Sequence, residues 1–100
     1  MKTYNKLVRD KIPEILDKKG VKYEKRIASK SEYKVALSKK LIEEVSEFQE
    51  ENSVEELADV VEVIRALKKL PKYKNVEKIR VKKAKERGFF EKRIILKGKY

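Results

Sequence analysis

Acidic side chains are concentrated in one stretch of this sequence. Residues 41–64 read LIEEVSEFQEENSVEELADVVEVI, with nine carboxylates and no Lys or Arg. The whole chain is basic, with 28 Lys and Arg against 17 Asp and Glu and a formal net charge of +11. Grouped carboxylates can bind a divalent cation or act as general acids and bases. The stretch is therefore the first candidate for a chemical site.

Helical periodicity places four of these carboxylates beside predicted core residues. On a helix expected at about residues 30–49, Glu44 falls within the apolar face and Glu47 at its edge, whereas Glu43 points to solvent. On a second expected helix, which follows a tight break at Asn52 and Ser53, Glu56 lies within the apolar face and Asp59 just beyond it.

The short link makes the two helices antiparallel neighbours, so that their acidic pairs converge at one seam. Removing several like charges from water is costly unless a cation compensates for them. The chain has no His and no Cys, which leaves oxygen ligands and favours Mg²⁺, with Mn²⁺ as a substitute. A structural interpretation stays open on spacing alone, because Glu is a strong helix former and Glu56 also suits a capping partner of Ser53.

Length and composition limit the remaining possibilities. One hundred residues with 40% hydrophobic content predict one globular domain, residues 1–100. No apolar run is long enough for a membrane span, and no signal-peptide core follows Met1, so a cytoplasmic protein is expected. The positive charge favours a polyanionic partner such as nucleic acid or a phosphorylated small molecule.

The predicted elements are mainly helical. A short helix is expected between Asp10, a possible N-cap, and Gly20, followed by a strand at residues 21–28. Capping boxes at Ser29–Glu32 and Ser53–Glu56 open the two central helices, of which the second runs to about Lys69. A fourth helix runs from Asn75 to Gly88, and residues 91–100 resemble a strand. We expect a mainly α fold, an antiparallel helical bundle with a possible small β-ribbon.

Three separated segments resemble one enzyme family. Glu43-Glu44-x-x-Glu47 followed by Glu56-x-x-Asp59 is similar to the paired acidic motif of the MazG-like, all-α nucleoside triphosphate pyrophosphohydrolases. YNKLVRDKIPEIL near the start and KK-x-K-x-RGFF-x-KRIIL near the end resemble the small single-domain branch of this superfamily related to phosphoribosyl-ATP pyrophosphohydrolase. The resemblance thus covers nearly the whole chain.

The resemblance implies a role for each matching residue. It makes Glu44, Glu47, Glu56 and Asp59 the magnesium ligands. Glu43 and Glu44 become the candidate catalytic carboxylates, with Glu43 in an auxiliary role. The matching phosphate-binding residues are Lys83 and Arg87, and also Lys6, Arg9 and Lys11.

The implied reaction is hydrolysis of a nucleoside triphosphate between its α and β phosphates, which releases a monophosphate and pyrophosphate. Such enzymes remove noncanonical or surplus nucleotides, and they work as dimers or tetramers in which helices of neighbouring subunits complete the pocket. We expect neither a membrane nor a nucleic acid as partner. Two departures from the pattern are the short gap between the acidic motifs and Gly88-Phe89-Phe90, where this branch more often has two glycines.

Two other functions fit parts of the sequence. A basic nucleic-acid-binding module without catalytic activity would use the Lys-rich arms, with Tyr4, Tyr23, Phe89 and Phe90 as stacking groups. It gives no reason for four acids at a buried seam. A catalytically silent antitoxin-like or scaffold protein would keep the fold but lose a ligand, whereas all four ligand positions here are acidic.

Overall fold

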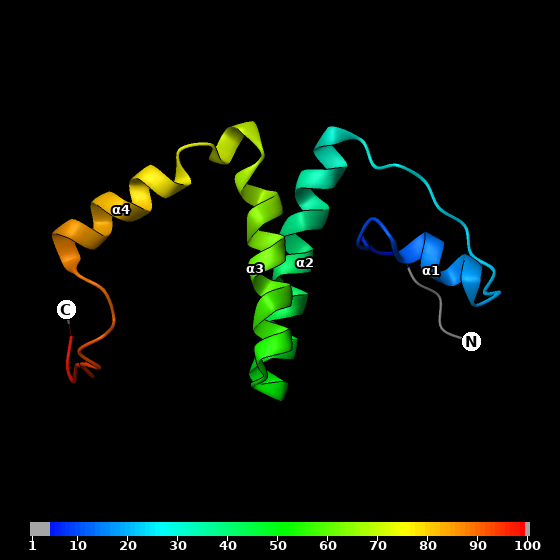
Figure 1. The fold of residues 1–100 in the computed structure, drawn as a ribbon. Coiled ribbons are helices and arrows are strands. Elements are labelled where there is room, and N and C mark those ends of the chain that lie inside the picture. The colour runs from blue at the N-terminus through cyan, green and yellow to red at the C-terminus, as the bar shows by residue number, and fades with distance from the viewer. Residues whose placement is uncertain (1–4, 100) are drawn as a thin grey trace.

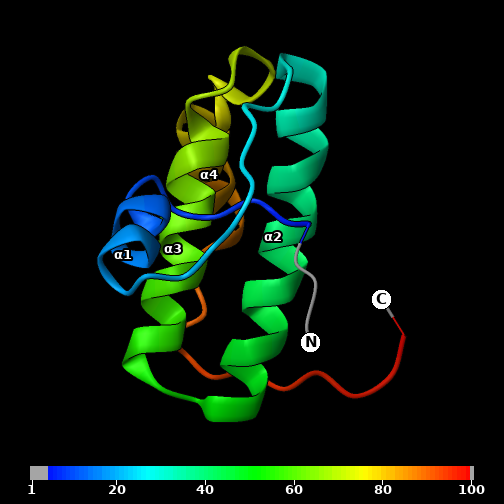
Figure 2. The same cartoon turned by 90° about the vertical axis from the view of Figure 1, so that its right-hand side faces the viewer.

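The computed structural model describes residues 5–99, in which every regular element is helical. In chain order these are α1 (Ile12–Lys18), α2 (Lys30–Glu51), α3 (Val54–Lys68), the 3₁₀ helix η1 (Pro71–Tyr73) and α4 (Val76–Arg87). Helices α2 and α3 form an antiparallel hairpin at the centre, while α1 and α4 project on opposite sides of it (Figures 1 and 2). The mainly α prediction is confirmed.

Local sequence signals define the central hairpin. The Ser29 hydroxyl caps α2 by accepting a hydrogen bond from the Glu32 backbone N–H, and Ser53 caps α3 through the Glu56 N–H. Asn52 ends α2 in the left-handed conformation, with φ of 50°, which Asn tolerates better than most residues. The predicted N-caps at Ser29 and Ser53 and the break between the two helices are therefore confirmed.

The seam between α2 and α3 holds the buried core of the described residues. Leu37, Val60 and Val63 are its buried apolar residues, and Glu44 is buried among them. This core is narrower than the apolar faces predicted from periodicity, because Leu57, Val61 and Ile64 stay more than two fifths exposed. Residues 5–99 thus contain a helical hairpin, and the predicted bundle arrangement is not confirmed.

The segment before α2 differs from its prediction. Helix α1 begins at Ile12 after Lys11, not Asp10, and no side chain caps it. Residues 21–28 have no regular structure, and none of residues 5–99 belongs to a strand. The β-ribbon is thus not confirmed over the described residues; the last residue of its second strand, residue 100, lies outside them. Figure 1 shows why: residues 21–28 and the C-terminal segment lie on opposite sides of the hairpin, so neither has a strand to pair with.

Helix α4 follows η1 and leads away from the hairpin (Figure 1). Its N-cap residue is Asn75, as predicted, although the Asn75 side chain makes no capping hydrogen bond. Gly88 follows the last turn with φ of 81°, a conformation that favours glycine. One ion pair joins α4 to α3, between Lys68 Nζ and Glu77 Oε2 at 3.3 Å, and Arg80 binds the other oxygen of Glu77.

The Glu77 cluster predicts an acid-sensitive link between these helices. Hydrogen bonds from Arg80 and Lys68 lower the pKa of Glu77 from 4.5 to about 2. Because the folded pKa lies below the unfolded one, the stabilisation is complete above pH 4.5 and is lost as the pH falls toward 2. We expect a modest loss of stability, since the side chains of Lys68, Glu77 and Arg80 are exposed. NMR titration of the Glu77 carboxyl, followed together with the amide chemical shifts of α4, tests this prediction. A pKa near 4.5 for Glu77 contradicts the prediction. Amide shifts of α4 that still titrate between pH 4.5 and 2 in the Glu77→Gln variant contradict it as well.

No helix among residues 5–99 is long and apolar enough to cross a membrane.

Candidate metal centre

Three carboxylates from the two central helices meet at the seam. Glu44 comes from α2, and Glu56 and Asp59 come from the first turns of α3. One carboxylate oxygen from each lies within 4.8 Å of the others. The antiparallel hairpin produces this convergence because its two-residue link places the C-terminal half of α2 beside the N-terminal half of α3. Sequence spacing predicted these three residues correctly as neighbours.

Two oxygens of this cluster have unmet hydrogen-bonding capacity. Glu44 is only 7% exposed, and Oε2 of Glu44 and Oε2 of Glu56 are buried without a hydrogen-bond partner. Burying a carboxylate oxygen without a hydrogen-bond partner costs free energy, and a bound cation offsets that cost directly. The donor set, carboxylate oxygens alone, matches what Mg²⁺ and Mn²⁺ prefer. The residues present therefore fit a hard divalent metal ion.

The electrostatics of the cluster support the same assignment. Burial raises the pKa of Glu44; Lys40 opposes this, and Glu47 and Asp59 add to it. Burial also raises the pKa of Glu56, again with contributions from Glu47 and Asp59. Glu47 itself is exposed and lies outside the three-residue cluster. The structure thus brings the fourth predicted ligand close enough to act electrostatically, but does not place it among the converging oxygens.

Cationic side chains from the N-terminal segment lie against the acidic cluster. Arg9 Nη2 donates a 2.6 Å hydrogen bond to Asp59 Oδ1, and Lys6 Nζ lies 3.3 Å from Glu43 Oε1. These contacts bring together residues that are 37 and 50 positions apart in the sequence. Lys11, the third predicted residue of this segment, is an exposed residue at the N-cap of α1. The structure therefore places Lys6 and Arg9 at the candidate site and leaves Lys11 on the surface.

The sequence predictions overlooked Lys40. Its side chain is 18% exposed, and its Nζ lies 3.3 Å from Glu44 Oε1 and 3.5 Å from Glu43 Oε2. The pKa of Glu43 is raised by burial, but Lys40 and Lys6 together outweigh this and lower it. The signal that would have identified Lys40 is its spacing of three and four residues from Glu43 and Glu44, which are neighbouring positions on a helix surface.

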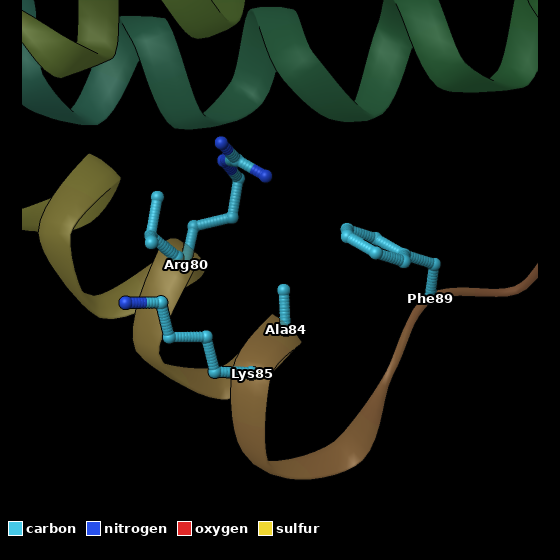
Figure 3. Close-up of a pocket in the computed structure, with 5 residues that line it drawn as sticks. Arg80, Ala84, Lys85 and Phe89 are labelled. Carbon is cyan, nitrogen blue, oxygen red and sulfur yellow. The ribbon is translucent and has the colours of Figure 1, made fainter.

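The predicted phosphate-binding residues of α4 are not at this site. Lys83 and Arg87 are exposed on the helix that leads away from the hairpin (Figures 1 and 2). On α4 an open hollow of about 290 Å³ is lined by Arg80, Val81, Ala84, Lys85 and Phe89, with the Phe89 ring facing the helix (Figure 3). This hollow contains none of the clustered carboxylates. Lys83 and Arg87 reach those carboxylates only if α4 moves or comes from another subunit.

The aromatic residues considered for nucleic-acid stacking have different environments. Phe89 and Phe90 are largely exposed after α4. The Tyr23 hydroxyl donates a 2.7 Å hydrogen bond to Asp17 Oδ1, and Tyr4 lies outside the described residues. Among the described residues proposed for stacking on nucleic-acid bases, Phe89 and Phe90 are therefore the ones whose rings are largely exposed.

Comparison with protein-family models, with curated proteins and with solved structures finds no match for this chain.

Proposed function

We propose that this chain is a Mg²⁺-dependent nucleoside triphosphate pyrophosphohydrolase of the MazG-like type. The observation that carries the proposal is the pair of buried, unpartnered oxygens on Glu44 and Glu56 within one carboxylate cluster. A purely structural role for these acids gives no reason to leave two charged oxygens buried without donors. The resemblance of three sequence segments to that family supplies the reaction class.

Four residues would hold the metal ion. Glu44, Glu56 and Asp59 already converge, and Glu47 would join them by a side-chain movement from its exposed position. Bound Mg²⁺ would neutralise phosphate charge and lower the pKa of a bound water, and Mn²⁺ would serve as a substitute. Glu43, whose pKa is lowered by Lys40 and Lys6 against the effect of burial, stays ionised at neutral pH, as a proton acceptor must.

The surrounding cations suit a polyphosphate. Arg9 and Lys6 lie at the edge of the acidic cluster, where they would meet the phosphates of an incoming nucleotide. Lys83 and Arg87, with Lys11, stay predicted phosphate-binding residues. The resemblance also implies a homo-oligomer, a dimer or tetramer in which helices of neighbouring subunits complete the pocket, and a role in removing surplus or noncanonical nucleotides. A cytoplasmic location stays the expectation from the sequence.

A pyrophosphate-release assay tests the proposed reaction. The purified chain would be incubated with Mg²⁺ and a panel of nucleoside triphosphates, with the products separated by ion-exchange chromatography. We expect equal amounts of monophosphate and pyrophosphate, and no product in the presence of a chelator. Glu44→Gln is expected to be inactive although folded, whereas Glu50→Gln, an exposed glutamate on the same helix, serves as the matched control with unchanged turnover.

The other outcomes separate the alternatives. Release of orthophosphate instead of pyrophosphate contradicts the proposed cleavage position. Mg²⁺ binding without turnover of any triphosphate would favour a different pyrophosphate-bearing substrate. Absence of both turnover and Mg²⁺ binding, with tight binding of single-stranded nucleic acid, would favour the nucleic-acid-binding alternative.

A further inference from the structure

Lys40 on α2 contacts two carboxylates of the candidate metal centre from within its own helix. Its Nζ lies 3.3 Å from Glu44 Oε1 and 3.5 Å from Glu43 Oε2, and its side chain is only 18% exposed. Lysine is one of the residues most often found at the surface, because its ammonium group is strongly hydrated. A lysine that is covered to this extent is held by its partners, and both partners belong to the candidate site.

The contact with Lys40 distinguishes the two oxygens of the Glu44 carboxylate. Oε1 takes part in the ion pair, whereas Oε2 is buried without a hydrogen-bond partner. The terminal torsion of a glutamate side chain is broad, so a carboxylate without partners can turn within its site. The ion pair restrains this rotation and leaves Oε2 as the oxygen of Glu44 that a cation can bind beside Glu56 and Asp59.

Lys40 does not take the place of the cation itself. An ammonium group that substituted for a metal ion would contact carboxylates of both helices. Within the described part of the chain, the ion pairs of Lys40 are with Glu43 and Glu44, both on α2, and none is with Glu56 or Asp59 of α3. Glu56 Oε2 has no hydrogen-bond partner. Lys40 therefore contacts the cluster from the α2 side and leaves the α3 carboxylates to another cation.

The limited exposure of Lys40 also separates it from the proposed phosphate contacts. Lys6 and Arg9 have exposed side chains at the edge of the same cluster, where a substrate can reach them from solvent. Lys40 is mostly covered and already contacts two carboxylates. Its surroundings suit a group that orients a metal ligand better than a group that binds phosphate.

We propose that Lys40 is a positioning residue of the metal centre, which holds Glu44 Oε1 so that Glu44 Oε2 stays available to the divalent cation. This role rests on the proposed metal centre and adds a residue to it. Groups that bind the outer atom of a metal ligand fix the orientation of that ligand. Because Lys40 also contacts Glu43 Oε2, one side chain positions both carboxylates that are proposed for catalysis.

Calorimetric titration of the full chain with Mg²⁺, without substrate, tests this role through the sign of the change. Removing a positive charge beside a cation site should by itself strengthen cation binding, whereas losing the orientation of Glu44 weakens it. Lys40→Met is therefore expected to weaken Mg²⁺ binding by about 10- to 100-fold. Lys39→Met, which removes the same charge from the adjacent exposed residue, is the matched control and should not weaken Mg²⁺ binding.

Further variants separate positioning from a general effect on the fold. Lys40→Arg keeps a cationic donor at this position and is expected to bind Mg²⁺ more tightly than Lys40→Met. The electron paramagnetic resonance spectrum of bound Mn²⁺ should change in Lys40→Met, because a ligand loses its orientation, and stay unchanged in Lys39→Met. If circular dichroism shows that Lys40→Met does not fold, Lys40→Gln replaces it. Its shorter side chain withdraws the donor from Glu44 Oε1, and the same loss is expected.

The results distinguish failure of this role from failure of the metal centre. If the wild type binds Mg²⁺ and Lys40→Met binds it equally or more tightly, the positioning role is overturned and the metal centre stands. Equal losses in Lys40→Met and Lys39→Met overturn the role as well, because the loss then does not depend on the contact with Glu44. An unchanged Mn²⁺ spectrum in Lys40→Met has the same consequence. Absence of saturable Mg²⁺ binding by the wild type overturns both proposals.

Discussion

Replacing Glu56 by Gln is expected to lower kcat/KM for pyrophosphate release by at least about 100-fold and to stabilise the metal-free protein. Catalysis falls because an amide is a weaker metal ligand than a carboxylate. Stability rises because burial and four neighbouring carboxylates raise the pKa of Glu56, which means that the fold disfavours the charged form of this side chain. The new amide group also supplies donors where Glu44 Oε2 has no partner.

Kinetics and thermal unfolding in chelator measure the two effects together. Glu55→Gln, at the adjacent exposed residue of the same first turn, is the matched control and should leave activity and Tm nearly unchanged. A Glu56→Gln protein that loses stability without metal but keeps full turnover would contradict the assignment of Glu56 to a metal site. Opposite changes in stability and activity are typical of sites built for function.

Replacing Arg9 by Met is expected to have opposite effects on metal binding and on turnover. In the structure the Arg9 guanidinium forms an ion pair with Asp59, with Nη2 2.6 Å from Oδ1. Removing the guanidinium frees this carboxylate oxygen and should strengthen Mg²⁺ binding by the protein in the absence of substrate. Turnover should fall by roughly 100-fold, because the proposed phosphate contact and its charge stabilisation are lost. Calorimetric Mg²⁺ titration and steady-state kinetics measure the two quantities separately.

Lys22→Met provides the comparison for Arg9, since Lys22 is an exposed cation outside the acidic cluster. It removes the same charge and should change neither quantity measurably. If Arg9→Met weakens Mg²⁺ binding, Arg9 supports the carboxylates structurally rather than contacting phosphate. Unchanged turnover in Arg9→Met would remove Arg9 from the proposed substrate site.

Local signals in the sequence predicted the central hairpin closely. Ser29 and Ser53 each cap a helix as expected, because an N-cap hydrogen bond involves residues only three positions apart. The convergence of Glu44, Glu56 and Asp59 followed from helical periodicity and a short link. Such features depend on few residues and tolerate little variation in geometry.

Features that depend on distant contacts were predicted less well. A strand needs a partner, and residues 21–28 have none among the described residues, so β propensity alone was insufficient there. Leu57, Val61 and Ile64 were predicted to be buried, yet no surface among residues 5–99 covers them fully, and they stay 42% to 48% exposed. Lys40 is a different case, because its contacts with Glu43 and Glu44 lie within one helix and its spacing from them was a local signal that the sequence predictions overlooked.

The most direct test of the central claim is a calorimetric titration of the metal-free full chain with Mg²⁺, in parallel with Glu44→Gln. The account predicts saturable binding at one site per chain, which the Glu44→Gln substitution abolishes while the helical circular-dichroism signal stays unchanged. Glu50→Gln should bind as the wild type does. Absence of saturable binding by the wild-type chain, or equal binding by the wild type and Glu44→Gln, would contradict the assignment of the carboxylate cluster as a metal centre.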